Sequence, residues 1–379
     1  MKFFSVPQIK NPTRPDAGDD AAFLDGDGIF KRVGNSGNMA FMYAIRQHVD
    51  SIRHASESNH GNPDVFVVGA SNQVNKNVTP SLDMPMFRQS LPIVQIGLGA
   101  QAPNLEHDFE MQEATLAWIE KIQSLSPTDY PNISVRGMYT YSVFEKYGVH
   151  QKAVPLGCPS LFINPAKNLG AIIKAGLKTN YRRIGTGPGN LMAKAQHIVP
   201  LERSLAEIAE WGGGGYLVQH PKQLFSLSFG DRSQIAEEDL DHIRARIKPH
   251  LTTDEFCHWF AGNAKLFVNV PSWLHYARSL DAYVGMRIHG TMLTIQSGKP
   301  ALCVALDSRQ HELCQIMHIP HIAAEEFFDG VNIGKVTEVL ATHDWDAFDE
   351  NRRNLSGKYI EFLNNNKLKE TELIAHLAA

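Results

Sequence analysis

The chain has 379 residues, of which 43% are hydrophobic and 20% charged, which is ordinary globular composition and enough length for two domains. Its 36 basic and 40 acidic residues give a net charge of −4, which argues against a nucleic-acid-binding protein. The sequence predicts no signal peptide and no membrane span, and its four scattered cysteines lack Cys-x-x-Cys spacing, so a reducing cytoplasm is expected.

The first half of the chain alternates apolar runs with helix-like segments. A helix is expected over 107–124, because Leu116, Ile119 and Ile122 recur at the spacing of one helical turn. Runs of β-type residues predict strands at 64–70, 92–100, 132–138 and 153–157. Strands that alternate with helices are typical of a parallel sheet covered on both faces.

The second half repeats this alternation after an interruption at 162–180, where we expect the chain to cross between domains. Strands are expected at 182–187, 216–220, 265–270, 282–286 and 300–306, and helices at 202–211, 236–249 and 271–280. We therefore predict an α/β protein with two Rossmann-like domains that face a cleft, spanning residues 1–165 and 180–330. Helices in 331–379 are expected to pack back on the first domain.

Two glycine-rich segments stand beside expected strands and helices. In "GNSGNMAFMYAI" (34–45), Asn35, Ser36 and Asn38 stand where a helix begins, so they either cap its amides or bind a polar ligand. The segment "GTGPGN" (185–190) follows a strand but lacks the Lys-Ser/Thr pair of a P-loop. It is therefore either a loop that cradles a phosphate or a plain turn.

Basic residues stand at the ends of expected strands in both halves. Arg136 ends a run in the first half, and His220, Arg287 and Arg309 take the same position in the second. In an open α/β sheet, ligands bind in the crevice beyond the carboxyl ends of the strands. The four side chains are expected either to converge on one anionic ligand or to form ion pairs with some of the 40 carboxylates.

Two other kinds of site are not favoured by the sequence. Cys158, in "GCPS" at a strand end, has no base placed beside it in the sequence, so a buried thiol is expected rather than a nucleophile. The chain has 17 histidines but no His-x-x-x-His pattern, so no metal site is predicted.

Three segments together resemble the polysaccharide pyruvyl transferase family. They are "GNSGNMAFMYAI", then "SVRGMYTYSVFEKYGV" followed by "GCPSLFINP", and then "LDAYVGMRIHGTMLTIQSGKPALCVALDSR". Their order and spacing match from about residue 30 to 322, and the Gly-x-Arg-Ile-His-Gly segment is the most specific part. The resemblance implies a glycosyltransferase-B-like fold and transfer of pyruvate from phosphoenolpyruvate to a sugar as a ketal.

The resemblance and the residue chemistry together suggest roles for the candidate residues. Arg287 is expected to bind the anionic donor, while His289 moves protons because its charge changes near pH 7. Asp19, Asp20 and Asp307 are weaker candidates for the second base. The expected substrate-binding residues are Arg136, Arg309, His220, Asn35 and Asn38, with Gly290 and Thr291 at the start of the following helix. No cofactor or metal is expected, and the partners would be phosphoenolpyruvate and a sugar or oligosaccharide, which can be lipid-linked.

Two departures from the family pattern leave the acceptor and the reaction open. Asn38 stands where many members carry an acidic residue, and "GCPS" replaces a common Asp-Pro pair. A nucleotide-sugar glycosyltransferase would share the fold, but it usually needs an acidic pair near the second-half helix, where "TMLTIQSG" has no carboxylate. A non-catalytic glycan-binding protein is the other alternative, and it would not need a proton donor beside Arg287.

Overall fold

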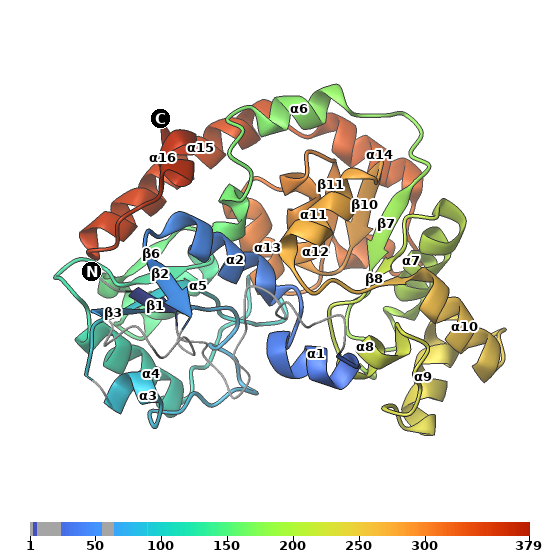
Figure 1. Ribbon diagram of the computed structural model, residues 1–379, viewed down its shortest axis with the longest axis horizontal. Coiled ribbons are helices and arrows are strands. Elements are labelled where there is room, and N and C mark those ends of the chain that lie inside the picture. The colour runs from blue at the N-terminus through green and yellow to red at the C-terminus, as the bar shows by residue number, and fades with distance from the viewer. Residues whose placement is uncertain (1–2, 6–23, 55–63, 89) are drawn as a thin grey trace.

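The computed structural model describes residues 3–5, 24–54, 64–88 and 90–379 (Figure 1). Within them the chain forms two six-stranded sheets, and every assigned strand pair is parallel. Helices lie against both sheets, and the chain ends in helices that come after the strands of the second sheet in the sequence. The prediction of an α/β protein with two Rossmann-like sheets and C-terminal helices is confirmed.

The first sheet has the strand order β2-β1-β3-β4-β5-β6. This is the flavodoxin-like order of doubly wound sheets, extended by one strand. Its strands are β1 (Phe3–Ser5), β2 (Ile52–His54), β3 (Val65–Gly69), β4 (Ile93–Leu98), β5 (Ile133–Val135) and β6 (Ala153–Pro155). The helices of this half are α1 (Gly26–Val33), α2 (Asn38–His48), α3 (Pro85–Arg88), α4 (Glu113–Ser124) and α5 (Met138–Lys146).

The second sheet has the order β12-β11-β10-β7-β8-β9, which counted along its own strands is the 3-2-1-4-5-6 order of dinucleotide-binding folds. Its strands are β7 (Ile184–Gly187), β8 (Tyr216–Leu217), β9 (Ala264–Lys265), β10 (Ala282–Gly285), β11 (Ala301–Ala305) and β12 (His321–Ala323). The helices are α7 (Val199–Gly212), α8 (Gln223–Leu227), α9 (Glu237–Ile247), α10 (Thr253–Asn263), α11 (Val270–Arg278), α12 (Ile288–Gln296) and α13 (Ser308–Ile316).

Four segments differ from the sequence prediction. The predicted helix 107–124 begins only at Glu113, so residues 107–112 remain a loop. The predicted strand 265–270 ends at Lys265, because Asn269 caps the Ser272 amide and starts α11 at Val270. Strand β12 and helix α10 did not stand out as separate elements in the sequence.

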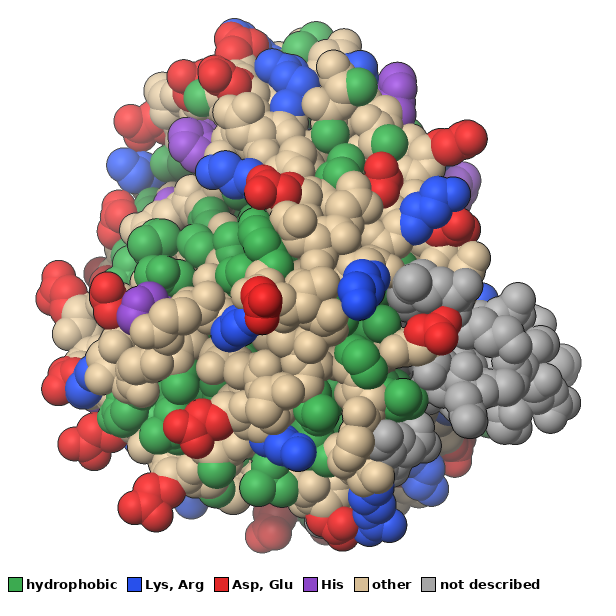
Figure 2. Space-filling model, turned by 90° about the vertical axis from the view of Figure 1, so that its left-hand side faces the viewer, with side chains coloured by type: hydrophobic (Ala, Val, Ile, Leu, Met, Phe, Trp, Pro, Cys, Tyr) green, Lys and Arg blue, Asp and Glu red, His purple; other side chains and the backbone are tan. Residues whose placement is uncertain are grey.

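The chain passes between the sheets through α6 (Leu169–Ala175), and it returns along α14 (Ile333–Thr342), α15 (Trp345–Asn365) and α16 (Glu372–Ala378). Figure 1 shows α15 running from the region of α6 toward the first sheet, with α16 beside it. The backbone of Asp50 donates to the Lys369 carbonyl at 2.8 Å, which ties the chain after α15 to the end of α2. On the side of the first sheet, described Lys and Arg side chains are interspersed with Asp and Glu (Figure 2).

Arg352 anchors α15 to the crossover segment from inside the protein. Its side chain is fully buried and donates through Nε to the Leu161 carbonyl at 2.9 Å and through Nη1 to the Ala166 carbonyl at 2.6 Å. Nη2 donates to the carbonyl of Asn164. One guanidinium therefore satisfies three carbonyls of a turn that would otherwise lack partners.

Replacing Arg352 with alanine is expected to lower the free energy of unfolding by about 3 kcal/mol or more, because it leaves these buried carbonyls unpaired. Urea unfolding of Arg352→Ala would measure the loss. The matched control is Arg353→Ala, whose exposed side chain lies 3.5 Å from the Lys167 carbonyl and should change stability by less than about 0.5 kcal/mol. Equal effects of the two substitutions would contradict the anchoring role.

Candidate active site

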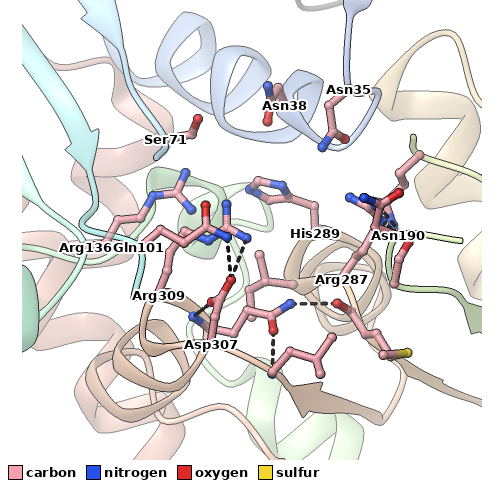
Figure 3. A pocket seen from close by; sticks show the side chains of 16 residues that line it. Asn35, Asn38, Ser71, Gln101, Arg136, Asn190, Arg287, His289, Asp307 and Arg309 are labelled. Atoms are coloured by element: carbon pink, nitrogen blue, oxygen red, sulfur yellow. Dashed lines mark hydrogen bonds and ion pairs between the residues drawn. The ribbon is translucent and has the colours of Figure 1, made fainter. Parts of the chain in front are cut away.

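A cavity of about 230 Å³ lies where the carboxyl ends of both sheets face each other (Figure 3). Most of its polar side chains follow β3, β4 and β5 in the first half and β7, β8, β10 and β11 in the second, while Asn35 and Asn38 lie at the start of α2. Open α/β sheets bind ligands at this position. The polar and charged residues that line the cavity are Asn35, Asn38, Ser71, Gln101, Arg136, Asn190, Gln219, Arg287, His289, Asp307, Arg309 and Gln310.

Hydrogen bonds between the two halves hold the walls of this cavity together. The Ser36 amide donates to the Gln219 carbonyl at 3.1 Å, which fixes the start of α2 against the end of β8. On another wall, Gln101 Nε2 donates to Asp307 Oδ2 at 2.9 Å. The site is therefore formed jointly by both halves, and neither half contains it alone.

Arg136 reaches the cavity from the end of β5 and is only 1% exposed. Its Nε donates to the Gly97 carbonyl at 2.8 Å and its Nη2 to the Ala70 carbonyl at 3.2 Å. Burial lowers the pKa of Arg136 to about 10, so the guanidinium is positive at neutral pH. Backbone carbonyls hold this charge in place, so it can still bind an external anion.

Arg287 is held in the same way from the second half. Its Nη2 donates to the Gly189 carbonyl at 2.8 Å, and its Nε lies 3.2 Å from the carbonyls of both Pro188 and Gly189. Burial lowers its pKa to about 10, which again leaves a positive charge at neutral pH. The glycine-rich segment 185–190 thus contributes carbonyls that position Arg287, and it places Asn190 at the cavity.

The glycines near Arg287 make room for the Tyr283 side chain. A Cβ atom at Gly187, Gly285 or Gly290 would lie 2.3 Å from the Tyr283 hydroxyl oxygen, which is closer than any real contact. Gly290, predicted to bind substrate, therefore has a packing role and is not among the residues that line the cavity.

Helix α12 begins at Ile288, three residues before the predicted start at Thr291. Arg287 is its N-cap residue, and His289 lies in its first turn. Thr291 is fully buried with its Oγ1 3.5 Å from the Leu302 carbonyl, and it is not among the residues that line the cavity. The prediction that Thr291 contacts the ligand is therefore corrected, because the extra turn carries it into the core.

Asp307 is the single carboxylate among the described residues that line the cavity. Its Oδ1 accepts from the Gln310 amide at 3.0 Å and so caps α13, while Oδ2 accepts from Gln101. The same Oδ2 lies 3.4 Å from Arg309 Nη2. These contacts fix the carboxylate orientation at the edge of the cavity, where it can accept a proton from a ligand.

His289 lies at the centre of the cationic wall and is 7% exposed. Burial lowers its pKa well below the usual value, and the positive charges of Arg136 and Arg309 lower it further. Its ring lies 5.8 Å from that of Phe41 on α2, and Nε2 lies 3.8 Å from Cys158 Sγ. The imidazole is therefore neutral at pH 7 in this arrangement. The pKa of His289 would rise only when a bound anion offsets the positive charges of Arg136 and Arg309.

Replacing Cys158 with aspartate is expected to raise the pKa of His289 by about 1 to 3, because a carboxylate beside Nε2 favours the charged imidazolium. An NMR titration of the histidine ring would measure the change, with Cys158→Ser as the neutral control of similar size. An unchanged His289 pKa in the aspartate variant would show that residue 158 does not contact the imidazole.

The electrostatics of the cavity favour an anion. Among the residues that the structure describes, three arginines line it against one carboxylate, and Asp307 is already engaged with protein donors. The N-termini of α2, α12 and α13 also open on the cavity, through Asn38, Ile288 and Asp307. Helix N-termini carry partial positive charge and free amides, so they add to the attraction for an anion.

His220 is not among the residues that line the cavity. Its ring lies 6.2 Å from that of Phe30, and burial together with the nearby charge of Arg287 lowers its pKa to about 4. It is therefore neutral at pH 7 and adds no charge to the site. Asp19 and Asp20, the weaker candidates for a base, lie outside the described residues.

Several lining residues carry amide or hydroxyl groups that the sequence analysis did not single out. A usable signal was present, because each of Ser71, Gln101 and Gln219 follows a strand within three residues, as the arginines do. Gln219 is 2% exposed and its Nε2 has no hydrogen-bond partner among the described residues. A buried amide without a partner at a cavity wall is suited to bind a polar ligand.

Neither a metal centre nor a membrane-spanning helix is present among the described residues. No group of three or more His, Cys, Asp or Glu side chains is placed to hold a metal ion. No described helix combines the length and apolar character needed to cross a bilayer. All four cysteines are buried free thiols, as expected for Cys158.

Solved structures with a similar arrangement are distant in sequence. The UDP-GlcNAc 2-epimerase of Methanocaldococcus jannaschii, in complex with UDP-GlcNAc and UDP, is 10% identical with a TM-score of 0.43, covering 95% of this chain and 100% of that one. S. aureus MnaA with UDP is 10% identical with a TM-score of 0.45, covering 97% and 99%. The wall teichoic acid polymerase TagF is 11% identical with a TM-score of 0.40, covering 97% and 89%. Similarities this weak say nothing about what this chain binds.

Matches in sequence identify the family of this chain more clearly than these structural similarities do. No curated protein matches the chain. The profile named Polysaccharide pyruvyl transferase matches residues 35–308, which is well over half of the chain and includes every described cavity residue except Arg309 and Gln310. The chain therefore belongs to the polysaccharide pyruvyl transferase family and is a glycan-modifying transferase.

Proposed function

We propose that this protein transfers the pyruvyl group of phosphoenolpyruvate to two hydroxyl groups of a sugar, forming a cyclic ketal and releasing phosphate. The proposal rests on the convergence of Arg136, Arg287 and Arg309 on one cavity beside His289 (Figure 3). Phosphoenolpyruvate carries a carboxylate and a phosphate, and the planar fork of arginine binds each of these groups through two-point contacts.

The size of the cavity supports a small donor. Its volume of about 230 Å³ is below the roughly 300–1,000 Å³ of sites for drug-sized ligands, so a three-carbon phosphate ester suits it better than a sugar nucleotide. Helix α12 also contains no carboxylate that could hold a ribose or donor sugar. Both observations favour phosphoenolpyruvate over the nucleotide-sugar alternative.

The reaction needs one protonation at carbon and two attacks by oxygen. Bound phosphoenolpyruvate would offset Arg136 and Arg309, so His289 can take up a proton and give it to the methylene carbon. A sugar hydroxyl then attacks the central carbon and gives up its proton, and phosphate leaves with the electrons of its C–O bond. The second hydroxyl attacks the same carbon, and its proton balances the charge of the released phosphate.

The position of each lining residue suits it to one part of this reaction. The arginines bind the donor anion and stabilise the negative charge that gathers on the departing phosphate. Asp307, the lining carboxylate, is the candidate acceptor for a proton from the attacking hydroxyl. His289 and Asp307 lie on neighbouring segments of the second half, so both can act on one bound donor.

A thermal-shift comparison with phosphoenolpyruvate, UDP, GDP and CMP tests this proposal. A ligand that binds only the folded state raises the unfolding temperature by mass action. Phosphoenolpyruvate is expected to stabilise the protein while the three nucleotides do not. Stabilisation by a nucleotide alone would favour a glycosyltransferase, and stabilisation by none would favour a non-catalytic glycan-binding protein.

A further inference from the structure

A second, larger cavity adjoins the first. It has a volume of about 700 Å³ and shares Gln101 and Asp307 with the cavity that holds the arginines. A ligand in the second cavity could therefore reach a ligand in the first across these two side chains. The volume lies within the roughly 300–1,000 Å³ typical of ligand sites and is about three times that of the first cavity.

Three loops of the first half form the walls of this second cavity: residues 75–77 after β3, residues 101–103 after β4, and residues 107–112 before α4. Hydrogen bonds connect these loops. Asn75 Nδ2 donates to Gln101 Oε1 at 2.8 Å, and Gln112 Nε2 donates to the Lys76 carbonyl at 2.6 Å. The walls are therefore set before a ligand arrives.

The chemistry of the walls suits an uncharged glycan. Of the described residues that line the cavity, four carry side-chain amides, and such groups both donate to and accept from hydroxyl groups. Phe109 and Met111 supply apolar surface, on which the C–H face of a sugar can lie. In contrast to the first cavity, no arginine is among the described residues that line it. Its charged lining side chains are Lys76 and the carboxylates of Asp108, Glu110 and Asp307, so the walls carry no excess of positive charge that would attract an anionic glycan.

We propose that this second cavity binds the acceptor, and that the acceptor is an uncharged oligosaccharide whose modified sugar points past Gln101 toward Asp307. The inference rests on the proposed function, because it assumes that the first cavity holds the donor. Asn35 and Asn38 line the first cavity and are not among the described residues that line the second. Room remains for further sugars along the 75–77 and 107–112 loops.

Asp307 has a chemical role at the place where the two cavities meet. Its carboxylate lines both cavities and is oriented by Gln101, so an acceptor hydroxyl that enters the first cavity meets an oxygen able to take its proton. The O–H bond breaks toward Asp307 as the new C–O bond forms at the donor carbon. The acceptor is therefore positioned and activated by the same two residues.

Blocking the second cavity while leaving the first intact tests this inference. Asn77→Trp places a bulky ring into the second cavity, and Asn104→Trp, at an exposed position that does not line it, is the matched control. Phosphoenolpyruvate binding is measured by calorimetry. Saturation-transfer NMR then measures the binding of maltotriose, cellotriose, mannotriose and galactotriose, with trigalacturonate as an anionic comparison.

At least one neutral trisaccharide is expected to bind the native protein and the control. Its affinity should fall at least about tenfold in Asn77→Trp, while phosphoenolpyruvate affinity stays unchanged, since a side chain that fills a site excludes its ligand. Equal trisaccharide binding in both variants, tighter binding of trigalacturonate, or no trisaccharide binding by a protein that binds phosphoenolpyruvate would overturn the acceptor site. Absence of phosphoenolpyruvate binding to the native protein would instead overturn the proposed function.

Discussion

Replacing Arg287 with alanine is expected to weaken phosphoenolpyruvate binding by about 10- to 100-fold, because a charge-assisted contact contributes roughly 1.5–3 kcal/mol. The guanidinium is already fixed by the carbonyls of Pro188 and Gly189, so little ordering is needed when the anion binds. Calorimetric titration of Arg287→Ala against the native protein measures the loss.

The matched control is Arg278→Ala, which removes an exposed arginine from α11 in the same half of the chain. It should leave the affinity unchanged. Arg287→Lys keeps the charge but loses the fork, so an intermediate affinity is expected. If Arg287→Ala stays folded by thermal unfolding and binds as tightly as the native protein, Arg287 does not belong to the donor site.

Replacing His289 with alanine is expected to lower turnover by about 10²- to 10⁴-fold, the range of general acid–base groups. Most phosphoenolpyruvate affinity should remain, because Arg136, Arg287 and Arg309 supply the charge. The loss should therefore appear in kcat more than in KM, as for an interaction made in the transition state. Steady-state kinetics of phosphate release, with exposed His275→Ala as control, would measure it.

Two other outcomes for His289→Ala would change the account. If affinity falls as much as turnover, His289 is a binding residue and Asp307 is left as the group that moves the proton. If neither affinity nor turnover changes, the histidine has no part in the reaction. The two outcomes are distinguishable because binding and turnover are measured separately.

The strand–loop–helix pattern in the sequence was enough to bring Arg136, Arg287, His289 and Arg309 to one place. Arg136 lies near the end of a predicted strand and the other three residues follow predicted strands, and parallel sheets gather such positions at one edge. The start of α12 was misplaced because Gly290 resembles a loop residue, whereas its role depends on Tyr283 packing against it. That contact is tertiary, so local sequence patterns cannot supply it.

The lowered pKa of His289 also depends on residues distant in sequence. Arg136 comes from the other sheet, and only folding brings its charge beside the imidazole. Gln101 shows the same limit of sequence reasoning. An amide after a strand is common, and only the structure shows that this side chain lines both cavities. The loop at 107–112 was predicted as helix, so the wall that it forms was hidden until the structure placed it.

Every residue role proposed above depends on phosphoenolpyruvate acting as the donor. NMR of the protein incubated with phosphoenolpyruvate and the neutral trisaccharides tests this role. We expect the phosphorus signals of phosphoenolpyruvate to give way to inorganic phosphate, together with a new proton signal from the methyl group of a pyruvate ketal on the sugar. Unchanged phosphoenolpyruvate, in a protein that instead releases a nucleotide from a sugar nucleotide in the presence of the same trisaccharides, would contradict this donor role.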